Sequence, residues 1–193
     1  MASPFDPNKV LLTGENPFMR LSEVEDGEIT TNASFWRVTF CPSGPGHALF
    51  LKSELTDHDW RIYSDNIAMT RWLQGTIQGV LNGELADTDI PVIDADFDHT
   101  GDVRAFWTEH VRSDEDDIAL TWYEIGEPVI RHTLPFSQPE RPYGVNTVLI
   151  PCMGARLTVN SEQASGRPFP REWDERPFST CALAFAESWT EWP

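Results

Sequence analysis

The residues from Val103 to Leu134 alternate between apolar and polar side chains with period two, and this pattern limits most strongly how the chain folds. Such alternation predicts strands with one buried face. An acidic break at 113–116 and a Gly126-Glu127 pair divide the stretch into three segments. The alternating apolar residues of the first two are Val103, Ala105, Trp107, Val111, Ile118, Leu120 and Trp122. We therefore expect three consecutive antiparallel strands over 103–134.

Charged residues interrupt the apolar face that carries the tryptophans. Glu109, Glu124 and Arg131 fall on the same side as Trp107 and Trp122. Burial changes the pKa of a carboxyl group and can fit it for proton transfer, and an arginine beside it can hold an anionic group of a ligand. The face predicts an internal pocket in which the three charged residues are catalytic and the two tryptophans contact the ligand. A satisfied Glu–Arg pair in a partly hydrated core explains the pattern equally well.

The register of the strands decides which side chains meet in this pocket. In the first hairpin we expect Trp107 to lie opposite Trp122. A two-residue turn at Gly126-Glu127 would then place Arg131 opposite Trp122 and diagonal to Glu124. The residue after this pair is a proline, which has no N–H to close a tight turn. A slip by one residue would present the opposite face of the strand instead.

Short strand candidates and Gly/Pro turns recur along the whole chain. Nine or ten short strands in 193 residues are typical of a barrel or a sandwich. We expect one mainly β domain over 1–193, an antiparallel β-barrel. Residues 1–16 are expected to form an N-terminal arm and residues 161–178 a long surface loop.

One helix is expected within this barrel, over residues 65–82. Its apolar residues recur at helical spacing and should pack against the sheet. These residues are Trp72, Leu73, Ile77 and Val80. Gly75 and Gly79 weaken the helix by about 1 kcal/mol each.

The layout of many short strands with a single helix resembles the calycin-type barrels, the lipocalin-like group, in which a β-barrel encloses a small apolar ligand. The chain departs from the pattern of that group at two points. Trp36 is preceded by Ser34-Phe35 and has no glycine two residues before it, and the helix stands between early strands. The resemblance therefore implies an architecture and an apolar ligand but no functional residue.

A second candidate site is the stretch Asp57–Asp65, which leads a strand into the helix. His58 stands between two acids, a setting for a general acid, and Arg61 or Tyr63 can point toward a barrel mouth. We expect these three residues to contact a ligand. A polar loop whose acids cap the helix explains the same residues and is the simpler interpretation.

Metal binding is not expected. The acids at 94, 96 and 98 resemble the first half of a calcium-binding loop, but neither alignment of Asp94–Asp102 supplies both the glycine and the terminal glutamate that the full loop needs. An acidic turn is the preferred interpretation, and a hard cation there stays open. No histidine pair has metal-ligand spacing, and no cofactor motif is found.

The charge balance disfavours two classes of partner. Lys+Arg is 14 and Asp+Glu is 31, which gives a formal net charge of −17. A negative field of this kind repels nucleic acid and anionic membrane surfaces. Three cysteines without CxxC spacing and an N-terminus without an export signal favour reduced thiols in the cytoplasm.

These observations leave the activity open between classes of function. The first is a cofactor-independent lyase, hydratase or isomerase that acts on a small hydrophobic molecule with a polar group. The alternative is a non-catalytic protein that binds a small aromatic or acyl ligand. A third is an interaction module whose tryptophans pack against a partner, and a homo-oligomer is not excluded. A cavity with convergent ionisable groups would favour the first, an apolar cavity the second, and a filled core the third.

Overall fold

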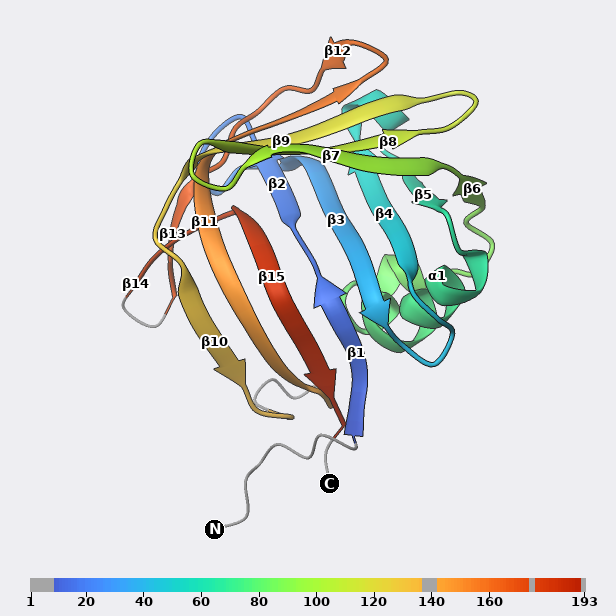
Figure 1. Cartoon of the computed structure of the whole chain (residues 1–193). Coiled ribbons are helices and arrows are strands. Elements are labelled where there is room, and N and C mark those ends of the chain that lie inside the picture. Colours follow the sequence, from blue (N-terminus) through green and yellow to red (C-terminus); the bar gives the residue numbers. More distant parts are fainter. Residues whose placement is uncertain (1–8, 137–141, 174–175, 192–193) are drawn as a thin grey trace.

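A computed structural model of the chain describes residues 9–136, 142–173 and 176–191, which form a mainly β fold with one helical layer (Figure 1). The strands are β1 (Val10–Glu15), β2 (Phe18–Ser22), β3 (Ile29–Phe40), β4 (Gly46–Ser53), β5 (Trp60–Ser64), β6 (Val92–Asp94), β7 (Asp96–Asp102), β8 (Phe106–Arg112), β9 (Asp117–Ile125), β10 (Val129–Thr133), β11 (Gly144–Val159), β12 (Glu162–Gln163), β13 (Pro170–Trp173), β14 (Arg176–Ser179) and β15 (Cys181–Thr190). The helical segments are η2 (Glu54–Thr56), α1 (Ile67–Leu73), the π-helical η3 (Gln74–Gln78), α2 (Gly79–Leu81) and η4 (Gly83–Ala86). Within the described ranges, none of these helices has the length and apolarity that crossing a membrane requires.

Thirteen strands belong to one mixed sheet. Its main path runs β6-β5-β4-β3-β1-β15-β11-β9-β8-β7, with β2 beside β3 and β15, and with β10 and β12 beside β11. Among the described strands only β5 and β6 pair in parallel. The strands β13 and β14 form a separate hairpin.

The two ends of this path meet without pairing. β6 ends at Asp94 and β7 begins at Asp96, so Ala95 alone joins the two outermost strands. The N–H of Ala95 donates to the carbonyl oxygen of Ser64 at 3.1 Å and so still belongs to the pairing with β5. The sheet curls back over itself (Figure 1), but in the described residues its end strands form no ladder with each other. The closed barrel is therefore not found, and the calycin-like layout is not confirmed.

The long strand β11 carries the sheet from one layer into the other. Its first half pairs with β15, and its second half pairs with β9. In Figure 1 it bends from the lower part of the sheet toward the upper layer, β7–β9, which crosses over β2, β3 and β4. Strands far apart in the sequence thus come to face each other.

Side chains of both layers fill the space between them. This inner core includes Phe35, Leu49, Leu120, Trp122 and Leu183, all without exposed surface. A second core lies on the other face of β3, β4 and β5, beneath the helix, and includes Trp36, Phe50, Ile62, Leu73 and Ile77. Because side chains alternate along a strand, β3 serves both cores. Among the described residues, packed side chains occupy the space between the layers where the pocket was expected.

The helix lies where the sequence predicts it. The side chain of Asn66 caps α1 by accepting a hydrogen bond from the N–H of Met69 at 3.1 Å. Leu73 and Ile77 are fully buried against the sheet, and Trp72 is half-buried against the same core. The expected burial of Val80 is wrong, since it is 38% exposed. The π-helical turn Gln74–Gln78 shifts the later residues around the axis and rotates Val80 away from the sheet.

The segment expected as an N-terminal arm supplies a central strand instead. β1 lies between β3 and β15, and its Leu12 is fully buried. At Gly14 the backbone of β3 is so close that a Cβ atom would lie 2.3 Å from the carbonyl oxygen of Arg37, so only glycine fits. The strand is short and pairs only with distant segments, so its local sequence gives little sign of it. Residues 1–8 of the expected arm lie outside the described residues.

Two further segments contain more strand than expected. The long loop predicted at 161–178 holds β12 and the hairpin of β13 with β14, although residues 174–175 lie outside the described part. Pro170 and Pro177 stand in this two-stranded hairpin, where strand edges without a partner tolerate proline. The acidic stretch Asp94–Asp102 contains β7, which pairs with β8.

The first hairpin of the alternating stretch confirms its expected register. Trp107 pairs with Trp122 and Glu109 pairs with Leu120 across β8 and β9. The described turn between them is held by the N–H of Ser113, which donates to the carbonyl oxygen of Asp116 at 2.9 Å.

The expected position of the third strand is wrong. β10 pairs with β11, so Arg131 lies opposite Thr147 rather than beside β9. The chain does not reverse at Gly126-Glu127, because the N–H of Gly126 donates to the carbonyl oxygen of Pro151 at 2.8 Å and Pro128 has no N–H to close a turn. β9 and β10 thus follow one another along the same strand, β11.

Which side of the helical layer is buried against the sheet can be tested directly by substitution. Ile77→Ala should lower the free energy of unfolding by about 2–5 kcal/mol, because it removes a fully buried side chain and leaves a cavity under the helix. Val80→Ala in the same layer should cost less than about 1 kcal/mol, because Val80 is partly exposed and the shorter side chain leaves no enclosed cavity. Urea unfolding followed by circular dichroism measures both, and equal losses would contradict the assigned faces.

Candidate functional site

The residues expected to share one pocket lie in separate places. Glu124 is exposed near the end of β9, where its φ of 52° turns the strand, and Arg131 is half-buried on β10. Trp122 is fully buried, and its indole N–H donates to the carbonyl oxygen of Phe18 at 3.0 Å. The expected Glu124–Arg131 pair beside two indoles is therefore wrong, because β10 leaves β9 and pairs with β11.

Trp107 and Glu109 do lie together, in a cluster with three residues that the sequence did not indicate. These three come from β1, β3 and β7, so four strands of both layers meet here. We call the whole set the front cluster: Glu15, Arg37, His99, Trp107 and Glu109.

The centre of the front cluster is an ion pair across the two layers. One guanidinium nitrogen of Arg37, Nη2, donates to Oε1 of Glu109 at 3.0 Å and to Oε2 at 2.9 Å. The other, Nη1, donates to the carboxylate of Glu15. The indole N–H of Trp107 donates to Oε1 of Glu109 at 2.7 Å. The guanidinium is thereby fixed in position by two acids.

Aromatic rings cover one side of this ion pair. The ring of His99 stacks on Trp107 with centroids 4.6 Å apart and planes 20° apart. Trp107 in turn meets the ring of Phe185 edge to face at 5.7 Å. The Nδ1 atom of His99 lies 3.4 Å from Nη2 of Arg37. The rings and the guanidinium thus form one continuous group.

The members of the front cluster differ in their access to solvent. The Glu109 side chain is fully buried, whereas 21% of the Arg37 side chain is exposed and His99 lies at the surface. Burial raises the pKa of Glu109, and the nearby charge of Arg37 and the hydrogen bond from Trp107 limit this rise. A ligand can therefore reach the rings and the guanidinium, while Glu109 acts through Arg37 and Trp107.

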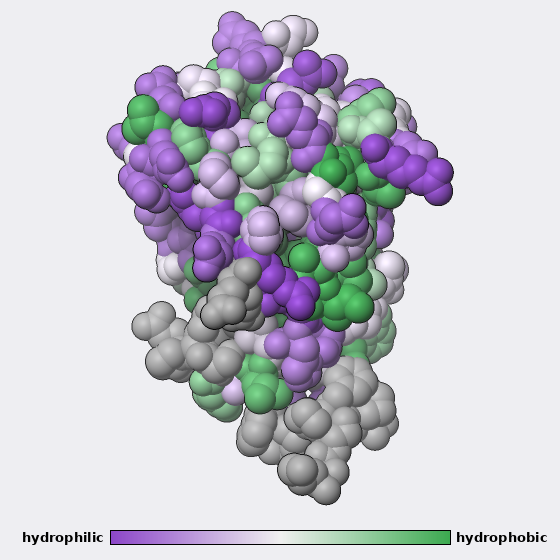
Figure 2. All heavy atoms as spheres, turned by 90° about the vertical axis from the view of Figure 1, so that its left-hand side faces the viewer, coloured by the Kyte–Doolittle hydropathy of each residue, from purple (hydrophilic) through white to green (hydrophobic). Residues whose placement is uncertain are grey.

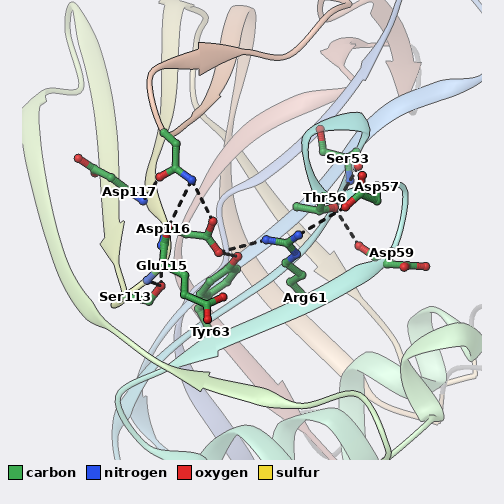
Figure 3. A network of polar contacts seen from close by, with 11 residues as sticks. Ser53, Thr56, Asp57, Asp59, Arg61, Tyr63, Ser113, Glu115, Asp116 and Asp117 are labelled. Atoms are coloured by element: carbon green, nitrogen blue, oxygen red, sulfur yellow. Dashed lines mark hydrogen bonds and ion pairs between the residues drawn. The ribbon is translucent and has the colours of Figure 1, made fainter.

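Arg61 and Tyr63 meet at a different buried carboxylate, that of Asp116 in the turn between β8 and β9 (Figure 3). The hydroxyl of Tyr63 donates to Oδ2 at 2.6 Å, and Nη1 of Arg61 donates to the same oxygen at 3.2 Å. The side-chain amide of Asn160 donates to Oδ1 at 3.2 Å. We call Arg61, Tyr63, Asp116 and Asn160 the turn cluster.

The turn cluster fastens the two layers together. Both oxygens of Asp116 accept hydrogen bonds from the protein's own donors, and the residue is 6% exposed. Burial, together with the bond to Asp116, raises the pKa of Tyr63, so its hydroxyl keeps its proton. His58, the third residue expected here, is exposed in a left-handed conformation with φ 61°. In the described part of the chain it joins neither cluster.

The described residues offer little to support a reactive cysteine or a metal site. Cys41, Cys152 and Cys181 are free thiols and buried. Burial raises the pKa of both Cys152 and Cys181 to about 12, which keeps them as unreactive thiols. No group of three or more His, Cys, Asp or Glu side chains within the described ranges is arranged to hold a metal ion.

The sequence pattern found two residues of each cluster and missed those on the partner strands. Arg37 and Asp116 bind the residues it did find, and they lie 72 and 53 positions away from Glu109 and Tyr63 respectively. One signal was present: Arg37 stands among the apolar residues Phe35, Trp36 and Val38, which are buried on both faces of β3. A charge in a strand buried on both faces needs a partner of opposite charge.

The turn cluster gives a stability prediction. Tyr63→Phe should lower the free energy of unfolding by about 1–3 kcal/mol, because buried Asp116 loses one of its hydrogen-bond donors. Tyr123→Phe makes the same chemical change on the outer face of β9 and should stay within about 0.5 kcal/mol. Thermal and urea unfolding of both variants provide the measurement. A loss at Tyr63 no larger than at Tyr123 would show that Asp116 does not depend on the hydroxyl.

Comparison of the chain with models of protein families, with curated proteins and with solved structures gave no match.

Proposed function

We propose that this protein binds a small molecule with a planar apolar part and a polar group, and that the front cluster is the binding site. The observation that carries the proposal is the solvent-accessible stack of His99 on Trp107 beside an arginine whose position is fixed by two carboxylates. Flat rings provide contact area at low entropic cost, and a fixed guanidinium is already oriented for a polar group. Ligand sites commonly combine such apolar surface with a few oriented polar groups.

A row of polar side chains supports this placement. Thr13 and Thr39 are hydrogen-bonded at 2.9 Å, and Nδ1 of His132 lies 2.5 Å from the side-chain oxygen of Asn146. Ser188 pairs in register with both Thr13 and Asn146 and so connects the two pairs. In Figure 1 the helices lie beside and behind β3 and β4, and β7–β9 cross the top of the sheet, away from the lower parts of β1, β10, β11 and β15. The row offers hydrogen-bond partners to hydroxyl or carbonyl groups of a ligand.

A row of apolar side chains runs beside the polar one. Ile130, Val148 and Phe185 are paired neighbours on β10, β11 and β15, and Phe185 contacts Trp107. Ile130 is 82% exposed. Figure 2 views the side of the molecule where β10 lies and shows hydrophobic residues gathered in patches on a mainly hydrophilic surface. The apolar part of a ligand has room to extend from Trp107 along this row.

A second candidate function is catalysis, by a lyase, hydratase or isomerase that needs no cofactor. The observation that favours it is the position of His99, which pairs with Glu109 across β7 and β8 and lies beside Arg37. In this case His99 would transfer the proton and Arg37 would hold the developing negative charge of the substrate. Binding remains the better supported function, because the expected acid, Glu109, is fully buried and its carboxylate already accepts hydrogen bonds from Arg37 and Trp107.

The binding proposal is tested by a fragment screen. Aromatic fragments carrying hydroxyl or amide groups are titrated into isotope-labelled protein, and ¹H–¹⁵N spectra identify the residues they reach. Fragments should shift the amide signals of residues in the front cluster. His99→Ala should lower the affinity of these fragments about tenfold, because one stacked ring and its hydrogen bond are lost. His58→Ala, which also removes an exposed histidine, should leave their affinity unchanged. Fragments that bind elsewhere, or equal effects of the two variants, would refute the proposal.

The same samples separate binding from catalysis. Each fragment that binds is incubated with the protein, and its own NMR signals are followed over time. Conversion to an isomer, hydrated product or cleavage product that stops in His99→Ala and continues in His58→Ala would establish the second candidate. Bound fragments that stay unchanged would favour a protein that only binds.

A further inference from the structure

The outer face of the upper layer carries a hollow that neither cluster uses. It measures about 360 Å³ and is lined by Phe106, Thr108, Thr121, Tyr123 and Arg156. These residues come from β8, β9 and β11. Because side chains alternate along a strand, Phe106 and Thr108 point away from the interior that Trp107 and Glu109 face. The hollow is therefore separate from the front cluster, although β8 builds both.

Cross-strand pairing arranges the lining residues in two rows. Phe106 pairs with Tyr123, which gives an aromatic row. Thr108 pairs with Thr121, and Thr121 pairs with Arg156, which gives a polar row. Phe106 is 45% exposed and Tyr123 37%, so both rings present surface to solvent. Neighbouring rows on one face of a sheet are about 7 Å apart, so a small ligand that lies on one row can reach the long side chain at the end of the other.

A glycine on β11 leaves space for the ring of Tyr123, which belongs to β9. The partner of Tyr123 on β11 is Gly154, and a Cβ atom at that position would lie 2.2 Å from Cε2 of the ring. Tyr123 therefore lies across the backbone of β11 in place of a side chain. The aromatic row is thus held in place by the backbone beneath it.

The row of Thr108, Thr121 and Arg156 ends in a positive charge that has no acidic partner among the described residues. Arg156 is exposed, and neither an ion pair nor a hydrogen bond of its side chain is found there. Arg112, on the same face of β8, is by contrast 3.8 Å from Asp117. In a chain with a net charge of −17, an arginine without an acid beside two rings and two hydroxyl groups is suited to an anion brought by a ligand.

We propose that this hollow binds a small aromatic carboxylate. The ring lies against Phe106 and Tyr123, the carboxylate accepts hydrogen bonds from the guanidinium of Arg156, and a threonine hydroxyl donates to it. The hydroxyl oxygens of Thr108 and Thr121 lie 3.0 Å apart, so one of them donates to the other and the second is left to donate to the ligand. This site goes beyond the proposed function and does not depend on it.

The probe for this site is phenylacetate, with phenylacetamide as a neutral molecule of the same shape. In ¹H–¹⁵N spectra, phenylacetate should shift the amides around Phe106, Thr121 and Arg156, and phenylacetamide should bind about tenfold more weakly. Arg156→Gln should lower the affinity for phenylacetate by the same factor. Arg112→Gln removes an equal charge from the same face and should leave the affinity unchanged. Ionic strength is held constant, so that a general effect of charge appears equally in both variants.

Three results would overturn the proposal. The first is the absence of shifts at the lining residues up to tens of millimolar phenylacetate. The second is equal binding of phenylacetate and phenylacetamide, which would mean that the carboxylate is not recognised. The third is an equal loss in the two arginine variants. Shifts confined to the residues around Trp107 and His99 would assign the acid to the front cluster instead, so the two sites are tested separately.

Discussion

The buried carboxylate of Glu109 is the constraint on which the arrangement of the two layers depends. A fully buried charge is costly unless donors surround it, and here both donors to it, Arg37 and Trp107, must be in place. Arg37 belongs to β3 and Glu109 to β8, so this requirement fixes how the upper layer sits on the lower one. Asp116 imposes the same requirement at the turn between β8 and β9. Glu109 lies in the middle of β8 and Asp116 lies in the turn after it, so the two acids hold this hairpin at two separate points.

Because side chains fill the space between the layers, a ligand has to bind at a surface of the molecule. The space that an open barrel would offer to a ligand is occupied by side chains such as Phe35, Trp122 and Leu183. What remains accessible are the edges and outer faces of the layers, where the same strand presents different chemistry on its two sides. β8 shows this most clearly: Trp107 contributes to the front cluster, and Phe106 contributes to the outer hollow.

Local patterns predicted the parts of the fold that depend on neighbouring residues. The register of Trp107 opposite Trp122 followed from alternation alone, and the helix followed from its apolar spacing. The sequence did not predict which distant strands pair. β1 lies between β3 and β15, although its own residues give little sign of this position. Arg131 lies on β10, which pairs with β11 rather than with β9. The site was therefore found only in part: Trp107 and Glu109 of one strand were visible, but their partners depend on contacts across the layers.

The most direct test of this account is a double-mutant cycle on the ion pair across the layers. The free energies of unfolding are measured for the wild type, Arg37→Gln, Glu109→Gln and the double variant. If the pair joins the layers as described, the single losses should not add, and the coupling energy should be about 1–3 kcal/mol. Losses that add to within about 0.5 kcal/mol would mean that the two side chains do not interact in solution. The front cluster would then not be formed as described.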